Sequence, residues 1–314
     1  MTILKFYTIF LFVSLFIYTN LISSDISDGN ISDIPRFEKD LTQIIGTGKS
    51  RNYHNLIALN TTAEYIKSEL SKSCDSVYFQ TYFVNKIEYK NVIAVKKSTN
   101  PKRIIIGAHY DVCDDQDGAD DNASGVAGLL EVARLLSKEK LNYTIEYVAY
   151  TLEEPPYFKS DKMGSYIHAK NLSDNEIDVK GMICLEMIGY FSDKPKSQTY
   201  PIGILSWFYG NKGNYIMVIR KWGAGDFAKS TTKLMKKQNL IKTKSFSCTS
   251  KLPSLDFSDH LNYWKFGFDA ILITNTAFYR NKNYHEETDK IKTLDLKKMS
   301  AVIDELYMTI KNIE

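Results

Sequence analysis

Apolar runs alternate with amphipathic stretches along most of the chain. Continuous apolar runs predict buried strands over residues 103–109, 144–151, 181–186 and 270–274. Apolar residues spaced three to four apart predict helices over residues 124–136, 163–171, 226–237 and 294–310. The same patterns predict mostly helical structure over residues 40–70 and a strand pair over residues 78–84 and 89–95.

Strands that alternate with helices predict a single α/β domain of three layers (αβα), with a mixed, largely parallel central sheet. In such sheets, ligands bind beyond the carboxyl ends of the strands. His109, Glu153 and Glu186 each stand at the end of an apolar strand, and His285 follows another. We therefore expect one edge of the sheet to collect these side chains.

The N-terminus has a different pattern. Lys5 precedes an almost unbroken apolar run from Phe6 to Ile17, and the residues up to Ser24 are smaller and more polar. This predicts a signal peptide over residues 1–24 and an exported protein, either secreted or periplasmic. The alternative is an uncleaved membrane anchor, because Phe6 to Ile22 spans about 17 residues, the lower limit for crossing a bilayer. A polar linker over residues 25–33 would lead to one catalytic domain over residues 34–314.

Composition narrows the classes of partner. The chain has 314 residues, of which 44% are hydrophobic, enough for a large core. Its 40 basic and 37 acidic residues are interspersed, so we expect no nucleic-acid partner. The cysteines show no short paired spacing, which argues against a disulfide scaffold and against a thiolate zinc site. One disulfide stays open as an alternative in an exported chain, and Cys184 is expected to be a buried free thiol.

The first candidate motif joins an imidazole to a carboxylate. His109 and Asp111 share one face of an extended segment, because side chains alternate along it. A metal-bound imidazole commonly donates its other ring N–H to a carboxylate, and Asp111 is placed for that role. The alternative is a solvated turn. The His109–Asp111 pair therefore indicates a metal site only together with the motifs that follow.

Between Gly118 and Gly125 stands an acidic segment at the start of a predicted helix. Asp121 can turn both carboxylate oxygens inward there, and two such oxygens can bridge two cations about 3.5–4 Å apart. Asp120 and Asn122 are better explained as N-terminal caps of the helix.

Three glutamates stand at strand ends. Glu153 and Glu154 are adjacent, so their side chains point in opposite directions on an extended segment. One can bind metal while the other acts as the general base, although two exposed carboxylates are the simpler alternative. Glu186 ends an apolar run, where a carboxylate is costly unless it is bound or reaches solvent. His285 lies in a polar loop after the 270–274 strand.

Together these motifs resemble those of the two-zinc aminopeptidase family of metallopeptidases, whose relatives include glutamate carboxypeptidases and single-zinc glutaminyl cyclases. The resemblance covers about Asn91 to the C-terminus. It rests on GAHYD, GADDNASG, LEEPP followed by MGS, LEMIGY, SDH and NYHEETD, in family order. It implies the zinc exopeptidase fold, of the phosphorylase/hydrolase-like type.

The resemblance also implies two Zn²⁺ ions per chain. Asp121 would bridge them, His109 and Glu186 would complete one site, and Glu154 and His285 the other. Many relatives have Asp where this chain has Glu186, which is one methylene longer.

Further roles follow from the same resemblance. Glu153 would be the general base, Asp111 would support His109, and Asp259 would lie close behind the metals. Tyr284 would offer its hydroxyl to the tetrahedral intermediate. Relatives commonly have a cis peptide after the bridging residue, here the Asp121–Asn122 bond.

These expectations favour a zinc-dependent exopeptidase, most simply an aminopeptidase that hydrolyses N-terminal residues from peptide substrates. Alternatives are a carboxypeptidase, which an arginine cluster in the pocket would favour, a dipeptidase or a non-peptide amidohydrolase. A glutaminyl cyclase is disfavoured because the chain has a full two-metal ligand set. An inactive binding ectodomain is disfavoured because every expected ligand position carries a side chain that can bind metal. Candidates for the pocket wall, or for ordinary core and turn residues, are Trp207, Phe208, Tyr209, Trp222 and residues 223–226.

Overall fold

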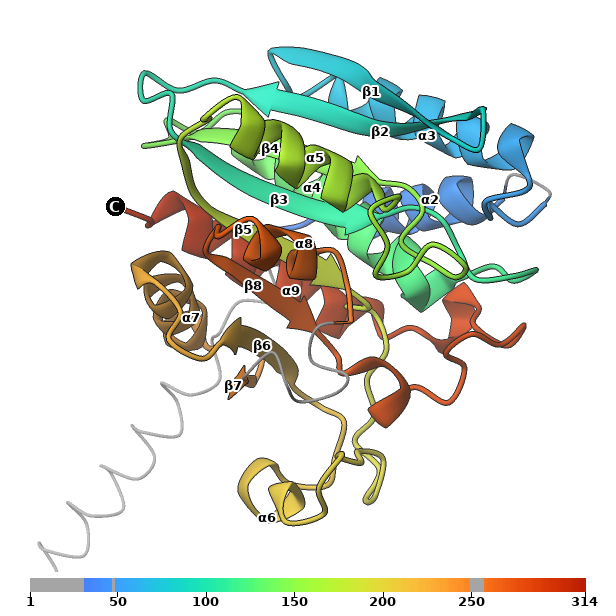
Figure 1. Ribbon diagram of the computed structural model, residues 1–314. Coiled ribbons are helices and arrows are strands. Elements are labelled where there is room, and N and C mark those ends of the chain that lie inside the picture. Colours follow the sequence, from blue (N-terminus) through green and yellow to red (C-terminus); the bar gives the residue numbers. More distant parts are fainter. Residues whose placement is uncertain (1–30, 47–48, 249–256) are drawn as a thin grey trace, which may run out of the picture. The chain divides into compact units, whose positions relative to one another are not determined.

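One mixed sheet lies at the centre of the computed structural model, which describes residues 31–46, 49–248 and 257–314 (Figure 1). The strands are β1 (Ser76–Val84), β2 (Ile87–Lys96), β3 (Arg103–His109), β4 (Thr144–Tyr150), β5 (Val179–Glu186), β6 (Ile216–Lys221), β7 (Thr243–Cys248) and β8 (Ala270–Thr274). Their order across the sheet is β1-β2-β4-β3-β5-β8-β6-β7.

The four central strands, β4, β3, β5 and β8, are parallel, whereas β1 and β2 pair antiparallel and β6 runs antiparallel to β8. The register pairs His109 with Tyr150 and Glu186 with Thr274. The carboxyl ends of the four central strands therefore meet at one edge, as the sequence predicted.

Helices cover both faces of the sheet. One face packs against α2 (Ile34–Ile45), α3 (Leu56–Leu70), α4 (Gly125–Leu136), α7 (Asp226–Gln238) and α9 (Leu296–Lys311). The other packs against α5 (Gly164–Asp174) and α8 (His260–Lys265). Ile104 and Ile106 of β3 join the first core and Ile105 joins the second, because side chains alternate along a strand. The predicted three-layer α/β fold is confirmed.

The long apolar patterns gave the central elements to within a few residues, but they did not predict β6, β7, α8 or the short helix α6 (Leu205–Tyr209). Segments as short or mixed as these carry too few periodic positions to be recognised. Residues 40–70 are mostly helical, as predicted: α2 ends at Ile45 and α3 begins at Leu56, with the Asn55 side chain accepting the Ala58 N–H.

The expected signal peptide or anchor, and residues 25–30 of the expected linker, lie outside the described residues. Ser32 and Asp33 belong to the folded unit: the Ser32 N–H donates to Asp304 at 2.8 Å, and Asp33 caps α2. Within the described part of the chain, none of the helices has the length and apolarity needed to span a membrane.

Candidate metal centre

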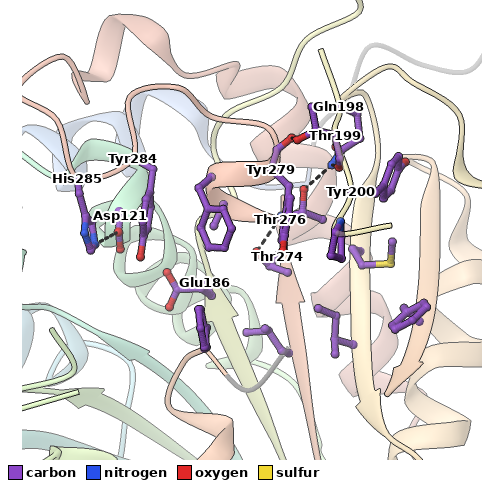
Figure 2. A pocket seen from close by; sticks show the side chains of 18 of the residues that line it. Asp121, Glu186, Gln198, Thr199, Tyr200, Thr274, Thr276, Tyr279, Tyr284 and His285 are labelled. Atoms are coloured by element: carbon purple, nitrogen blue, oxygen red, sulfur yellow. Dashed lines mark hydrogen bonds and ion pairs between the residues drawn. The ribbon is translucent and has the colours of Figure 1, made fainter. Parts of the chain in front are cut away.

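Five candidate metal ligands from different elements meet at the carboxyl edge of the sheet. They are His109 at the end of β3, Asp121 in the turn Ala119–Ser124 before α4, Glu154 after β4, Glu186 at the end of β5, and His285 in the loop after β8. All of them except His285 are buried. Figure 2 shows Asp121, Glu186 and His285 around one end of a pocket. Parallel strands explain how residues so far apart in the sequence come together.

Asp121 lies between the two histidines. Its Oδ1 is 3.3 Å from Nε2 of His109, and its Oδ2 is 3.3 Å from Nε2 of His285. Each carboxylate oxygen faces a different imidazole, as a carboxylate that bridges two cations would. The Asp121–Asn122 peptide bond is cis, as the resemblance implied.

Two glutamates complete the two halves of the centre. Oε2 of Glu186 is 3.3 Å from Nε2 of His109, and Oε2 of Glu154 is 3.1 Å from Nε2 of His285. The glutamates thus lie beside the histidines with which the resemblance grouped them. The hydroxyl of Ser258 donates to the same Oε2 of Glu186 at 2.7 Å. The role of these side chains as ligands stays a prediction.

The donor atoms fit zinc in kind and in spacing. Zinc binds imidazole nitrogen and carboxylate oxygen at about 2.0–2.1 Å, so neighbouring donors of a tetrahedral site are about 3.3 Å apart. The four N···O distances of this centre are 3.1–3.3 Å. Oε1 of Glu154 is buried without a hydrogen-bond partner among the described residues, which is costly unless a cation neutralises it.

The titratable groups of the centre have shifted pKa values, because they are buried and lie close together. Burial raises the pKa of Glu154 to about 7, and the negative charge of Asp121 acts in the same direction. Burial also raises the pKa of Glu153 well above its ordinary value, with a further contribution from the charge of Glu154. Burial alone would lower the pKa of His109, but the charges of Glu186 and Glu153 raise it well above its ordinary value.

Asp111 connects the histidine to both adjacent glutamates. Nδ1 of His109 is 3.2 Å from the backbone carbonyl oxygen of Asp111, its hydrogen-bond partner, and 3.6 Å from the carboxylate Oδ1, which is within ion-pair distance only. The two carboxylate oxygens also accept the backbone N–H groups of Glu153 at 3.2 Å and Glu154 at 3.1 Å. The sequence predicted that the Asp111 carboxylate supports His109, but the hydrogen bond goes to the backbone carbonyl of the same residue. The contacts with Glu153 and Glu154 depend on the pairing of β3 with β4.

Arg51, which precedes every motif and received no role from the sequence, holds the loop that carries Asp121. Its buried side chain donates from Nε to the Tyr110 carbonyl at 2.7 Å and from Nη2 to the Gly118 carbonyl at 2.8 Å. Nη1 donates to the Asp117 carbonyl. Burial lowers the pKa of Arg51 to about 10, so the guanidinium stays charged at neutral pH.

Asp289 fixes the same loop from the other side. Its carboxylate accepts the backbone N–H groups of Asp120 and Asp121, each at 3.0 Å. Asp289 is the last residue of the NYHEETD motif. The motif therefore drew attention to this residue, but the residue type alone did not indicate what it does.

The expected caps of α4 are half right. Oδ1 of Asn122 accepts the Gly125 N–H at 3.1 Å, which caps the first turn. Asp120 is not a cap: its fully buried carboxylate accepts the Gly189 N–H at 2.9 Å and the Asn275 side-chain amide at 2.7 Å. The Asp120 carboxylate therefore binds groups that are distant in the sequence instead of the N-terminus of α4.

The SDH segment lies behind the centre. Asp259 is fully buried, and burial raises its pKa to about 7, with the charge of Glu186 acting in the same direction. His260 packs edge-on against Trp264, with ring centroids 4.5 Å apart.

A cavity of about 550 Å³ extends from the centre. Asp121, Glu153, Glu154 and Glu186 are its acidic lining residues. Much of the remaining wall is apolar or aromatic and includes Tyr209, Met217, Ile219, Phe246, Leu272 and Phe278. No lysine or arginine is found among the described residues that line it.

Tyr284 stands where the centre meets the cavity. Its ring stacks on that of His285, with centroids 3.8 Å apart and planes 18° apart. Figure 2 shows it between His285 and the rest of the cavity.

The expected pocket wall needs correction. Tyr209 lines the cavity, but Trp207, Phe208 and Trp222 are 88%, 78% and 71% exposed and belong neither to its wall nor to the core. Residues 223–226 do not line it either. One face of the single turn α6 carries Leu205 and Tyr209, four residues apart, into the wall, and the other face is left in solvent.

Comparison with known proteins identifies the family. Residues 91–310 match the model of peptidase family M28. The chain belongs to peptidase family M28. It is therefore a metallopeptidase of a zinc-dependent family, and the matched range agrees with the extent of the resemblance seen in the sequence.

Proteins named as aminopeptidases are among the relatives and structural neighbours of this M28 peptidase. The chain is 40% identical over 285 residues to the uncharacterized protein YfbL of Escherichia coli (strain K12), covering 88% of this chain and 87% of YfbL. It is 26% identical over 225 residues to leucine aminopeptidase 1 of Emericella nidulans, covering 67% of this chain and 51% of that protein. The LapA aminopeptidase of Legionella pneumophila shares its fold, with a TM-score of 0.70, 19% identity and coverage of 90% and 73%.

We expect zinc to stabilise the metal-stripped enzyme more at about pH 8 than at about pH 5.5. The pKa of Glu154, raised to about 7, leaves this carboxyl protonated at the lower pH, and the raised pKa of His109 acts in the same direction. Competition with one such proton weakens binding roughly 30-fold, which is ~2 kcal/mol or roughly 4–8 °C in Tm. Thermal unfolding at both pH values, with one fixed excess of zinc, measures this; an equal zinc-induced increase in Tm would contradict it.

Proposed function

We propose that this M28 peptidase is an aminopeptidase that removes apolar N-terminal residues from peptides, using two zinc ions held by His109, Asp121, Glu154, Glu186 and His285. The observation that carries the proposal is the composition of the cavity: carboxylates at the metal end, apolar side chains beyond, and no lysine or arginine among its described lining residues. A free N-terminal amine suits the metal end, which offers zinc and the Glu153 carboxylate, and an apolar side chain suits the rest.

The same observation disfavours a carboxypeptidase. A substrate's terminal carboxylate needs an arginine or lysine partner when it is taken out of water.

Zinc, Glu153 and Tyr284 would have separate roles in peptide hydrolysis. When bound, zinc supplies a Lewis acid for the peptide carbonyl and lowers the pKa of water toward ~7. Glu153 lines the cavity with Oε2 3.9 Å from Nε2 of His109, and it would take the proton of the attacking water and pass it to the leaving amine. Tyr284 would donate its hydroxyl to the carbonyl oxygen as negative charge develops there.

A substrate screen tests the proposal. Leucyl- and phenylalanyl-4-nitroanilide should be hydrolysed by the zinc-loaded enzyme, and their N-acetylated counterparts should not. A chelator should abolish the activity and added zinc should restore it. Release of C-terminal residues from N-blocked peptides, or cyclisation of a glutaminyl peptide without hydrolysis, would overturn the aminopeptidase assignment.

Filling the cavity should change substrate preference. Ile219 is buried on β6 and lines the cavity, so Ile219→Phe takes up space needed by a large substrate side chain. We expect kcat/KM for the leucyl substrate to fall ~10-fold or more relative to the alanyl substrate. Trp207→Ala, at an exposed residue outside the cavity, is the control and should leave the ratio unchanged. An unchanged ratio in Ile219→Phe would place the substrate side chain elsewhere.

We also propose that the enzyme is exported, on the strength of the basic and then apolar N-terminus described above. Fractionation of cells and N-terminal sequencing of the mature protein test this. A mature chain beginning near Asp25 supports a signal peptide, an intact N-terminus in the membrane fraction supports an anchor, and an intact N-terminus in the cytosol contradicts export.

A further inference from the structure

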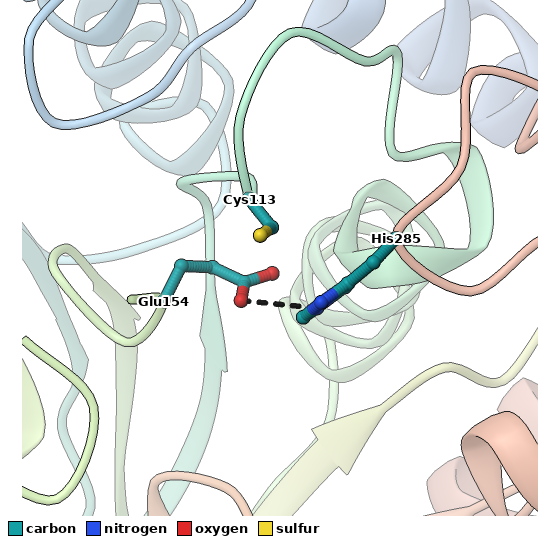
Figure 3. Close-up of side chains that lie close together, drawn as sticks. All are labelled: Cys113, Glu154 and His285. Atoms are coloured by element: carbon teal, nitrogen blue, oxygen red, sulfur yellow. Dashed lines mark ion pairs between the residues drawn. The ribbon is translucent and has the colours of Figure 1, made fainter. Parts of the chain in front are cut away.

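A cysteine stands beside the half of the centre formed by Glu154 and His285. Cys113 lies in the loop between β3 and the turn Ala119–Ser124, and its side chain is buried. Its Sγ and one donor atom each from Glu154 and His285 lie within 4.8 Å of one another. Figure 3 shows the three side chains converging from separate loops.

One carboxylate oxygen of Glu154 is not engaged by the ion pair with His285. Its Oε2 faces Nε2 of His285 at 3.1 Å, but the buried Oε1 has no hydrogen-bond partner among the described residues. In Figure 3, the oxygen outside the ion pair is turned toward Cys113. The thiol makes a long contact, 3.7 Å from Sγ to Oδ2 of the exposed Asp114, and it also interacts with the His285 side chain. The Cys113 thiol and Oε1 of Glu154 thus face the same space, but no hydrogen bond joins them.

We propose that the thiolate of Cys113 is a fourth protein ligand of the metal ion held by Asp121, Glu154 and His285. The inference rests on the two-metal centre proposed above. Zinc binds thiolate at about 2.3 Å, which sets the sulfur about 3.5 Å from nitrogen and oxygen donors of the same tetrahedral site. The Sγ of Cys113 lies within 4.8 Å of both other donor atoms, and the thiol proton would leave to solvent when sulfur binds.

The fourth ligand would give the two metal sites different tasks. Four protein ligands close a tetrahedral zinc site, whereas His109, Asp121 and Glu186 supply three and leave one position open. Glu153 lies beside this second group, 3.9 Å from Nε2 of His109. The site with Cys113 would then have a structural role, and the site of His109, Asp121 and Glu186, beside Glu153, would be the one with room for a further ligand.

Spacing along the chain gave no sign of this group, because the sulfur and its neighbours come from three loops. The paired short spacings of structural zinc sites belong to ligands that share one loop. Cys74, which is half-buried in a different part of the domain, offers a matched control.

Cobalt substitution tests the proposal. The metal-stripped full chain is titrated with Co²⁺ to two equivalents, and bound metal is counted by elemental analysis. Thiolate ligation gives an intense near-ultraviolet charge-transfer absorption that imidazole and carboxylate ligands do not give. We expect this absorption in the wild-type protein and in Cys74→Ser, and its loss in Cys113→Ser with cobalt still bound. Protection of Cys113 from iodoacetamide by zinc, measured by mass spectrometry on the wild-type chain, gives a second readout that needs no variant.

The outcomes separate this inference from the function on which it rests. Two bound cobalt ions without the absorption, or an absorption that survives in Cys113→Ser, overturn the thiolate ligand and leave the two-metal centre standing. Equal alkylation of Cys113 with and without zinc also overturns it. Failure to bind any metal overturns both proposals.

Discussion

We expect Glu153→Gln to lower kcat at least ~10²-fold and to leave the zinc content and the folded structure unchanged. Glutamine keeps the side-chain volume but cannot accept the proton of the attacking water. Glu153 lines the cavity and lies 3.9 Å from the nearest imidazole nitrogen, farther than the 3.1–3.3 Å of the four ligand pairs. Steady-state kinetics together with elemental analysis of the same preparation measure both effects.

The neighbouring Glu154→Gln is the matched control. The same chemical change one residue away removes a carboxylate 3.1 Å from Nε2 of His285, and a neutral amide is a poorer zinc ligand. We expect this variant to lose zinc from one site. Loss of zinc from Glu153→Gln with retention in Glu154→Gln would mean that the two roles are reversed. Full activity and full zinc content in both variants would remove the pair from the mechanism.

We expect Arg51→Met to destabilise the protein by about 3–5 kcal/mol, because it removes the donors of three backbone carbonyls in a buried loop. The side chain of methionine fills similar space, so the loss reports hydrogen bonds and charge more than packing. Arg51→Lys keeps the charge but lacks the planar fork, and should lie between wild type and Arg51→Met. Urea unfolding of the metal-stripped proteins measures the free energy directly.

Zinc binding should weaken in both Arg51 variants, since the loop they loosen positions Asp121. The control is Lys72→Met, which breaks an ion pair between Lys72, with its side chain 61% exposed, and Glu69. We expect it to change the free energy of unfolding by less than ~1 kcal/mol. An Arg51→Met protein that unfolds at the wild-type urea concentration would show that water or a shifted loop replaces the guanidinium.

The sequence determined the fold class and most of the centre because both are written in local patterns. β3 is a continuous apolar run that ends at His109, and α4 is an apolar helix preceded by an acidic, glycine-flanked turn. Parallel strands separated by helices must place their carboxyl ends on one edge, so ligands at those ends converge whatever the details of packing. Local order and family resemblance were enough to group His109 with Glu186 and Glu154 with His285.

Only the tertiary structure decided which groups support the centre and what surrounds it. Arg51, Cys113 and the second role of Asp111 depend on contacts between segments that are distant in sequence, for which no short motif exists. The cavity wall is likewise assembled from β6, β7, β8 and α6, so the exposed Trp207 and the lining Tyr209 could not be told apart by residue type. Strand order fixes where a side chain can reach, and packing then fixes which neighbours it meets.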